Sequence, residues 1–194
     1  MINQFKGFVI VVIIFFSVAT KAQQLGNTQT PVAEKNIYGI QAGFLGAWGY
    51  NETRLYKSLA LRSEIGFDLA LFGGGLIESS RSVNYALAFG VKFEPRWYYN
   101  FGKRQRKSKK IENNTGNFVA ISIASNFEDL VITDSDFVTI PNQVRIVPKW
   151  GIRRTIGQHF SYELGIGLGA GRAFNYREKW EAVLDLHIRF GFDF

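Results

Sequence analysis

The sequence predicts an all-β fold: a transmembrane antiparallel up-and-down β-barrel of eight strands, preceded by a cleaved signal peptide. Three observations carry this prediction. Long runs alternate between apolar and polar residues, an apolar segment lies near the N-terminus, and the chain ends on phenylalanine. Alternation with a period of two is typical of strands, because successive side chains point to opposite faces of a sheet.

The N-terminal segment has the order of a secretory signal, with Lys6 first, then an apolar stretch from Phe8 to Phe16, then small residues before a cleavage point after Ala22. A membrane-spanning helix needs about 20 apolar residues, more than this stretch offers. The expected domains are therefore a signal peptide over 1–22, a short linker over 23–35 and a barrel over 36–194.

Six alternating runs predict six strands. Each has about 10 to 14 residues, whereas strands of soluble proteins average about 5–6. Their polar face is built from glycine, alanine and charged residues, and their bulky apolar face carries Trp97, Tyr99 and Trp180 near strand ends, like the aromatic girdles of membrane barrels. We therefore expect the apolar face to contact lipid. The six runs lie near 58–71, 84–97, 117–126, 143–156, 159–171 and 179–194.

The segment 36–57 must supply two more strands, near 36–43 and 47–56, with a tight hairpin between them. The direction of its side chains is ambiguous, because Trp48 and Tyr50 share parity with Glu52. One long bent strand is the alternative, but it leaves seven strands, and single-chain barrels have even numbers.

Eight strands place both termini in the periplasm. The turns then expected outside the cell are Gly43–Gly46, 72–84, 127–142 and 172–178, and those expected inside are Tyr56–Ser58, 100–116 and Gly157–Gln158. Pro95 and Pro148 fall within strands, which predicts irregular pairing there.

Composition excludes several classes of site. The chain has no cysteine and two histidines, so disulfides, thiolate chemistry and a multi-histidine metal site are not expected. We predict no cofactor and no metal. The formal charge of +7 suggests nucleic acid, but an exported chain seldom meets it, and we predict no nucleic-acid partner.

Two segments, 94–118 ("EPRWYYNFGKRQRKSKKIENNTGNF") and 148–171 ("PKWGIRRTIGQHFSYELGIGLGAG"), resemble a family of small, largely uncharacterised bacterial outer-membrane β-barrel proteins. Together with "LRSEIGFD" and the phenylalanine ending, the resemblance covers most of 36–194. It implies the barrel fold and location in the outer membrane of a Gram-negative cell, and it brings no catalytic residues.

The polar face of the strands predicts a filled lumen. The interior of an eight-stranded barrel is just wide enough for side chains to fill it or to hold one small ligand. The inward positions hold eight cations and seven anions, and this near balance favours mutual ion pairs over a selective pore. They are Arg62, Lys92, Arg96, Arg145, Lys149, Arg153, Lys179 and Arg189, with Glu64, Asp68, Glu94, Glu163, Glu181, Asp185 and Asp193.

One constellation has the residue types of a hydrolase. His159, Ser161 and Glu163 would share one face of a strand and could supply a base, a nucleophile and an acid. Small eight-stranded lipid A deacylases use such residues. Here the three lie beside a periplasmic turn, in the wrong leaflet for lipid A, and a packed polar cluster is the favoured interpretation.

Two further features suggest partners. The alternating residues Phe190, Phe192 and Phe194 look like the signal read by the barrel insertion machinery. Residues Trp97, Tyr98 and Tyr99 are expected at the membrane interface, where they would hold a basic turn beside lipid head groups or an acidic periplasmic protein. That turn consists of Lys103, Arg104, Arg106, Lys107, Lys109 and Lys110.

The sequence therefore predicts a non-enzymatic outer-membrane barrel with a structural or interaction role. Its expected partners are outer-membrane lipid, the insertion machinery and a protein bound at the loops or at the basic turn. A narrow porin-like channel for small solutes and an outer-membrane lipid-modifying enzyme are the alternatives.

Overall fold

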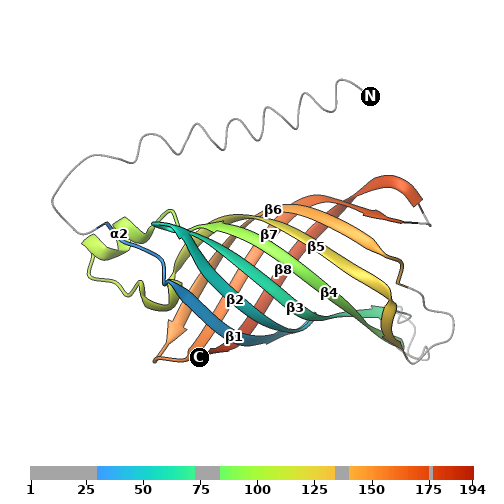
Figure 1. The fold of residues 1–194 in the computed structure, drawn as a ribbon, viewed down its shortest axis with the longest axis horizontal. Helices are drawn as coiled ribbons and strands as arrows, with labels where there is room; N and C mark the ends of the chain where they lie inside the picture. The colour runs from blue at the N-terminus through green and yellow to red at the C-terminus, as the bar shows by residue number, and fades with distance from the viewer. Residues whose placement is uncertain (1–29, 73–83, 134–139, 175–176) are drawn as a thin grey trace, which may run out of the picture.

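The computed structural model describes residues 30–72, 84–133, 140–174 and 177–194. Eight antiparallel strands form one closed sheet in chain order, and β8 pairs with β1 to close it (Figure 1). The predicted eight-stranded up-and-down barrel is thereby confirmed, while the expected signal peptide over 1–22 lies outside the described residues. The strands are β1 (Asn36–Gly43), β2 (Gly46–Tyr56), β3 (Leu59–Phe72), β4 (Asn84–Trp97), β5 (Gly116–Thr133), β6 (Gln143–Ile156), β7 (Phe160–Ala173) and β8 (Arg177–Asp193).

The segment 36–57 folds as a hairpin, and the alternative of one bent strand is wrong. β1 and β2 pair from Asn36 opposite Thr53 to Gly43 opposite Gly46. Trp48, Tyr50 and Glu52 are all buried. The carboxylate thus marks the inner face of β2, and the two aromatic rings point into the barrel with it.

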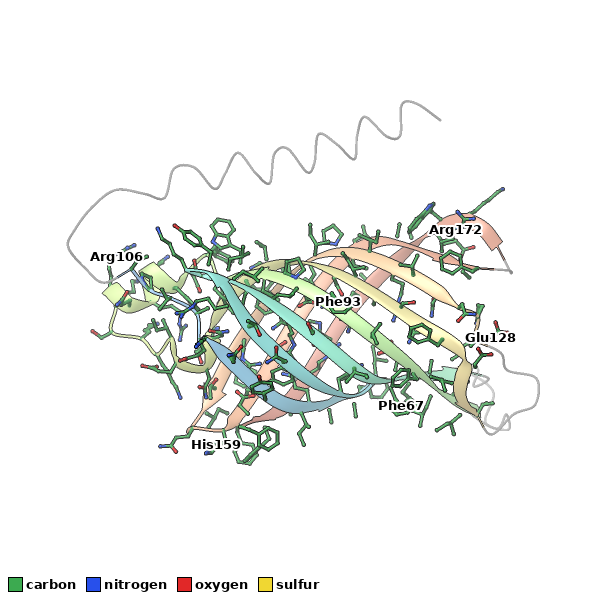
Figure 2. The ribbon with its side chains drawn as sticks, viewed as in Figure 1. Phe67, Phe93, Arg106, Glu128, His159 and Arg172 are labelled. Carbon is green, nitrogen blue, oxygen red and sulfur yellow. The ribbon has the colours of Figure 1, made fainter. Side chains whose placement is uncertain are left out.

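The barrel has two different ends, which can be followed in Figure 2. Arg106 and His159 lie at the end that carries helix α2 (Phe101–Arg106), here called the α2 end. Glu128 and Arg172 lie at the opposite end, here called the loop end, where the connections β1–β2, β3–β4, β5–β6 and β7–β8 occur. Because the strand number is even, the first and last strands begin and finish at the α2 end.

The connection between β4 and β5 is more ordered than the turn expected over 100–116. It holds α2 and a short 3-10 helix, η2 (Glu112–Asn114). Part of the expected linker binds this connection and the β2–β3 turn: the backbone N–H of Glu34 donates to Asn114 Oδ1 at 2.7 Å, and that of Ala33 donates to the carbonyl of Lys57 at 2.8 Å. The segment before β1 and the β4–β5 connection therefore both cover the α2 end.

Strand β5 continues to Thr133, seven residues beyond the expected end at 126, so the connection expected over 127–142 is shorter. The two prolines behave as predicted. Pro95 pairs with Leu61 of β3 but has no partner in the β4–β5 register, and Pro148 pairs with Ile121 of β5 but has none in the β6–β7 register. Each lacks the N–H that a second ladder would need.

Candidate functional site: the lumen of the barrel

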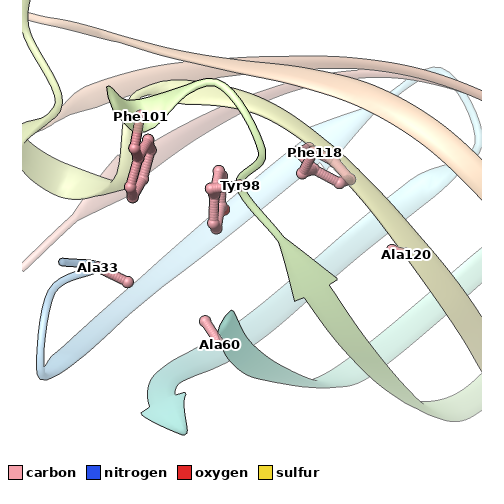
Figure 3. Packing of buried hydrophobic residues seen from close by; sticks show 6 residues of the cluster. All are labelled: Ala33, Ala60, Tyr98, Phe101, Phe118 and Ala120. Carbon is pink, nitrogen blue, oxygen red and sulfur yellow. The ribbon is translucent and has the colours of Figure 1, made fainter. Parts of the chain in front are cut away.

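A hydrophobic plug closes the lumen at the α2 end. The rings of Tyr98 and Phe101 stack with centroids 4.8 Å apart, and Phe118 meets Tyr98 edge-on at 5.6 Å (Figure 3). The small residues Ala33 and Ala60 complete the cluster. Tyr98 is only 1% exposed, so the expectation that it lies at the membrane interface is wrong.

Tyr98 also connects the plug to the charged layer that lies next to it on the side of the loop end. Its hydroxyl donates to Glu52 Oε1 at 2.7 Å, and Asn114 Nδ2 donates to the same oxygen at 2.6 Å. Burial of the phenol, followed by the nearby Glu52 carboxylate, raises the pKa of Tyr98 well above its usual value. The phenol therefore stays a neutral donor at any physiological pH.

Three arginines converge on Glu163 in the middle of the lumen. Arg62, Arg96 and Arg153 each place Nη1 near Oε1 of this carboxylate, at 3.0, 2.9 and 2.6 Å, and none of the four side chains is exposed. A single carboxylate cannot neutralise three guanidinium groups. The arrangement therefore requires further anions.

Each of the three arginines also binds a second carboxylate. Arg62 Nε donates to Glu64 at 2.6 Å. Arg96 Nε donates to Glu94 at 2.7 Å. The third pair joins Arg153 Nη2 to Asp193 at 2.6 Å.

Glu52 lies between two of these arginines, 3.5 Å from Arg62 Nη1 and 3.4 Å from Arg96 Nη1. Its other oxygen is the acceptor for Tyr98 and Asn114. This residue is missing from the predicted lumen set because its strand cannot be oriented from the pattern alone. It is the anion that ties the hydrophobic plug to the arginine layer.

A second charged layer lies toward the loop end. Glu64 receives Lys92 at 3.2 Å and Arg189 at 2.9 Å, and the Arg189 guanidinium lies 4.0 Å above the Trp48 ring. Lys149 bridges Glu94 at 2.6 Å and Asp185 at 3.4 Å. Because Glu64 and Glu94 also bind arginines of the first layer, the two layers form one network.

All eleven residues of the predicted polar network point inward. Among the described residues, the ion pairs join seven cations to seven anions, histidine apart. Lys179 and Glu181 were expected inside but are exposed. β7 still pairs with this part of β8, but the pairing of β1 with β8 ends at Arg189 and leaves the other side uncovered among the described residues. The eleven residues are Arg62, Glu64, Asp68, Lys92, Glu94, Arg96, Lys149, Arg153, Glu163, Asp185 and Arg189.

Inward glycines make room for inward-pointing rings on neighbouring strands. A Cβ on Gly151 would lie 2.5 Å from Phe118 Cζ, and one on Gly165 would lie 2.7 Å from His187 Nε2. Gly39 faces Tyr50 in the same way. At these three positions an inward glycine accompanies an inward ring on the neighbouring strand, whereas Gly167 and Gly191 face Lys149 and Gln41.

The hydrolase constellation does not form. His159 precedes the first residue of β7, and its ring stacks on Phe192 with centroids 5.2 Å apart while Nδ1 contacts the Asp193 carbonyl at 2.8 Å. Ser161 donates to the Asp193 carboxylate at 3.1 Å. Glu163 is held by the three arginines, so base, nucleophile and acid have separate partners.

The basic turn is solvent-facing. Arg104 is half-buried and donates to the Lys110 carbonyl at 2.9 Å, and Lys110 Nζ reaches the Gly157 carbonyl at 2.5 Å. The other four cations of the turn are also exposed: Lys103, Arg106, Lys107 and Lys109. Part of the turn is therefore fixed on the α2 end, and a patch of cations extends from it.

The C-terminal aromatics lie on the outer wall. Phe190 and Phe194 are 68% and 73% exposed, and Phe192 contacts both Phe160 and Phe194. In the part of the chain that the structure describes, no group of three or more His, Asp and Glu has the geometry of a metal site. No described helix is long and apolar enough to cross a membrane.

Above the charged layers the lumen widens into a cavity of about 460 Å³ near the loop end. Lys92 and Arg189 form part of its lining, together with Trp48, Arg145 and His187. Comparison of the chain with protein-family models, curated proteins and solved structures returns no match. The resemblance to a family of small outer-membrane barrels stays a prediction.

Proposed function

We propose that this chain is a non-enzymatic β-barrel of the Gram-negative outer membrane, with a closed lumen and a structural or interaction role. The observation that carries the proposal is the inversion of polarity across the wall. Fully buried arginines and carboxylates fill the inside, and large apolar side chains cover the outside.

The apolar exterior supports membrane location. Each of the eight strands has exposed large apolar side chains, whereas a soluble monomer rarely has a contiguous apolar patch larger than a few hundred Å². Phe67 and Phe93 on the outer wall are examples (Figure 2). Others on successive strands are Tyr38, Ile40, Leu55, Ile65, Ile121, Ile123, Trp150, Leu164, Ile166, Leu168, Leu184, Leu186 and Ile188.

Cell fractionation tests the location. The protein should sediment with outer membranes and migrate differently on gels before and after heating. Phe194→Asp should lower its abundance in the outer membrane, because the terminal aromatic is the proposed insertion signal. Phe174→Asp, at an exposed phenylalanine after β7, is the matched control. Equal abundance of the two variants and the wild type would contradict the insertion signal, and recovery of the protein in the soluble fraction would contradict the barrel's location.

The plug and the ion-paired layers support a closed lumen. A conducting pore needs a continuous water path, and Arg62, Arg96, Arg153, Tyr98 and Phe101 are all buried across it. In planar bilayers the purified protein should give no steady conductance. Regular ion-selective openings would instead favour the channel alternative.

The interaction role rests on the basic patch of the α2 end. In this proposal both termini and α2 face the periplasm, as in other even-stranded barrels. Exposed lysines and arginines there suit anionic phospholipid heads or an acidic periplasmic protein. The Ser108→Cys variant of this chain, which has no native cysteine, should resist impermeant thiol reagents in whole cells and react after permeabilisation. Labelling in intact cells would instead show that the α2 end faces the outside of the cell, and would contradict the proposed orientation.

A further inference from the structure

The barrel wall has a window near the loop end. β1 and β8 pair from Gly39 opposite Asp193 to Gly43 opposite Arg189, and β1 ends there. Residues Val183 to Ile188 of β8 continue beyond this point and pair with β7. Among the described residues, no strand pairs with the other edge of this segment. β8 can be seen to extend past the β1–β2 hairpin in Figure 1.

The opposite side of the window is β3. Strand β2 begins at Gly46, opposite Asp68, and the Leu69 N–H donates to the Leu45 carbonyl at 2.8 Å. Beyond Leu69 the described part of β3 pairs only with β4. The window is thus bounded by β8, by β3 and by the turn residues Phe44 and Leu45.

The 460 Å³ cavity opens through this window. Its lining includes the inward residues Asp185 and His187 of β8, and also the outward residues Leu184, Leu186 and Ile188 of the same strand. Leu184 and Phe44 of the lining are exposed, and this stretch of β8 has no strand partner on the window side among the described residues. The cavity therefore reaches the outer wall along the free edge of β8.

The mouth of the cavity is apolar. Phe44 is 76% exposed and Leu184 61% exposed, and both belong to its lining with Leu45 and Leu186. These residues continue the apolar exterior of β8 that runs to Phe194. If the barrel lies in the membrane as proposed above, the window faces hydrocarbon, and the free strand edge is tolerated because it borders a polar cavity.

The inner end of the cavity offers N–H groups without partners. His187 is 6% exposed, and neither ring nitrogen has a well-formed hydrogen bond: Nδ1 lies 3.5 Å from Asp185 Oδ1 and Nε2 lies 4.0 Å from Glu163 Oε2. Nε of Arg145 and Nε of Arg189 also have no partner within the described residues. The three cations of the lining, Lys92, Arg145 and Arg189, are each ion-paired, so the free binding capacity lies in these N–H groups. The cavity therefore favours a ligand that brings a hydrogen-bond acceptor such as a carboxylate.

We propose that the cavity binds a single-chain amphiphile with a carboxylate head, a fatty acid, which enters sideways from the membrane. The chain lies against Phe44, Leu45 and Leu186, and the carboxylate lies against His187 and Arg145. A volume of about 460 Å³ is within the range of small-molecule sites. Charge-assisted hydrogen bonds from buried N–H groups give the head group its specificity. This inference rests on the proposed membrane location.

The absence of native cysteine allows a direct test. Ser122 lines the cavity and is 2% exposed, while Ser161 is similarly buried but lies outside the cavity, beside Asp193. Ser122→Cys and Ser161→Cys proteins, each full-length after signal removal, are reconstituted into phosphatidylethanolamine vesicles. They are labelled either with pyrene maleimide dissolved in the bilayer or with a charged methanethiosulfonate in the water.

We expect pyrene maleimide to label the Ser122→Cys protein at least about tenfold faster than the Ser161→Cys protein, whose thiol reacts only when the ion-paired layer opens. With the charged reagent, the labelling rate of the Ser122→Cys protein relative to the Ser161→Cys protein should be smaller than the same ratio with pyrene maleimide. Palmitic acid at about ten times its dissociation constant should slow this labelling about tenfold. Hexadecanol, which has the same chain and no carboxylate, should protect the thiol less.

Three further variants in the Ser122→Cys background, one of them a control, test the two parts of the site separately. His187→Leu should remove the advantage of palmitic acid over hexadecanol, since the donor is lost and the chain site is kept. Ala124→Phe should fill the cavity and abolish protection by either compound. Ala170→Phe makes the same change on the outer face of β7 and should leave protection intact.

Several outcomes would overturn the inference. Equal labelling of the Ser122→Cys and Ser161→Cys proteins by pyrene maleimide would mean that no window opens. A larger Ser122→Cys to Ser161→Cys rate ratio with the charged reagent than with pyrene maleimide would mean that the cavity opens to water. Equal protection by palmitic acid and hexadecanol would exclude the carboxylate site. Failure of the protein to float with the vesicles would instead disprove the membrane location, so the two proposals fail in distinguishable ways.

Discussion

The two halves of the lumen use similar side chains but enclose them to different degrees. In the α2 half, the four side chains of the Glu163 cluster have no exposure and the plug covers them. In the loop half, the Arg145–Asp68 pair leaves 28% of each side chain exposed, and the cavity adjoins it. The same kind of ion pair is therefore part of a closed core in one half and the wall of a site in the other.

The difference arises from strand length. All eight strands surround the α2 half, whereas the β1–β2 hairpin ends before the loop half is enclosed. Because β1 and β2 are short, only the other six strands surround the loop half, and their side chains leave part of its interior unfilled. The closed α2 half therefore contributes most of the stability, and the proposed ligand access belongs to the opposite half of the same barrel.

Charge reversal should have the largest effect, and mainly in the α2 half. Arg62→Glu would set a new carboxylate beside Glu52, Glu64 and Glu163, without solvent. Loss of one partner of a buried ion pair costs about 3–5 kcal/mol, so this reversal should cost at least that. Arg145→Glu, partly exposed beside Asp68, should cost about 1 kcal/mol. Urea unfolding of the refolded barrels measures the free energy of unfolding of both variants. Equal losses would contradict the view that the α2 half is the more tightly enclosed of the two.

Crowding should be the next largest effect. Gly151→Ala and Gly165→Ala both drive a methyl group into a ring, that of Phe118 or that of His187. Phe118 is locked in the plug, so Gly151→Ala should cost about 1–3 kcal/mol. The His187 ring borders the cavity and can move, so Gly165→Ala should cost less. A larger loss for Gly165→Ala in thermal unfolding would show that the cavity half is as tightly packed as the plug half.

Removal of the Tyr98 hydroxyl should have a smaller effect, because Glu52 keeps Asn114 and two arginines as partners. We expect Tyr98→Phe to cost about 1–1.5 kcal/mol near neutral pH. The raised pKa of Tyr98 sets the pH dependence. Above about pH 10 the unfolded chain loses the phenol proton before the folded barrel does, so the wild type is selectively destabilised. The stability difference between the two proteins should therefore shrink as the pH rises past about 10, and a constant difference would contradict the buried phenol.

The exposed basic patch should give the smallest effect. Lys107→Gln removes one exposed cation that lies outside both halves of the lumen. In vesicles with anionic lipid, this substitution should weaken the electrostatic attraction between the basic turn and the lipid head groups by about 1 kcal/mol or less. The difference should vanish in about 1 M salt, which screens the charges. Lys179→Gln, at an exposed lysine of the loop end, is the control for the side of the membrane. The same loss for both variants would argue against a special role of the α2 end.

Much of the fold follows from the sequence alone, because alternation has a direct geometric meaning. Runs such as Leu184–Phe194 determine which residues face in and out along β8, and the eleven residues of the predicted polar network all point inward. The inward aromatic positions of β2 and β5 are not predictable in this way. Trp48, Tyr50 and Phe118 are aromatic, and an apolar ring by itself gives no indication of whether lipid or a packed lumen surrounds it.

The tertiary structure decided what the inward residues do. That Glu163 is shared by Arg62, Arg96 and Arg153 depends on how four strands are staggered around the barrel, and no spacing along the chain encodes this. The window likewise depends on where β1 stops pairing with β8, which is a property of two strands distant in sequence. Local periodicity fixes the face of each residue, whereas partners, enclosure and cavities depend on register across the closed sheet.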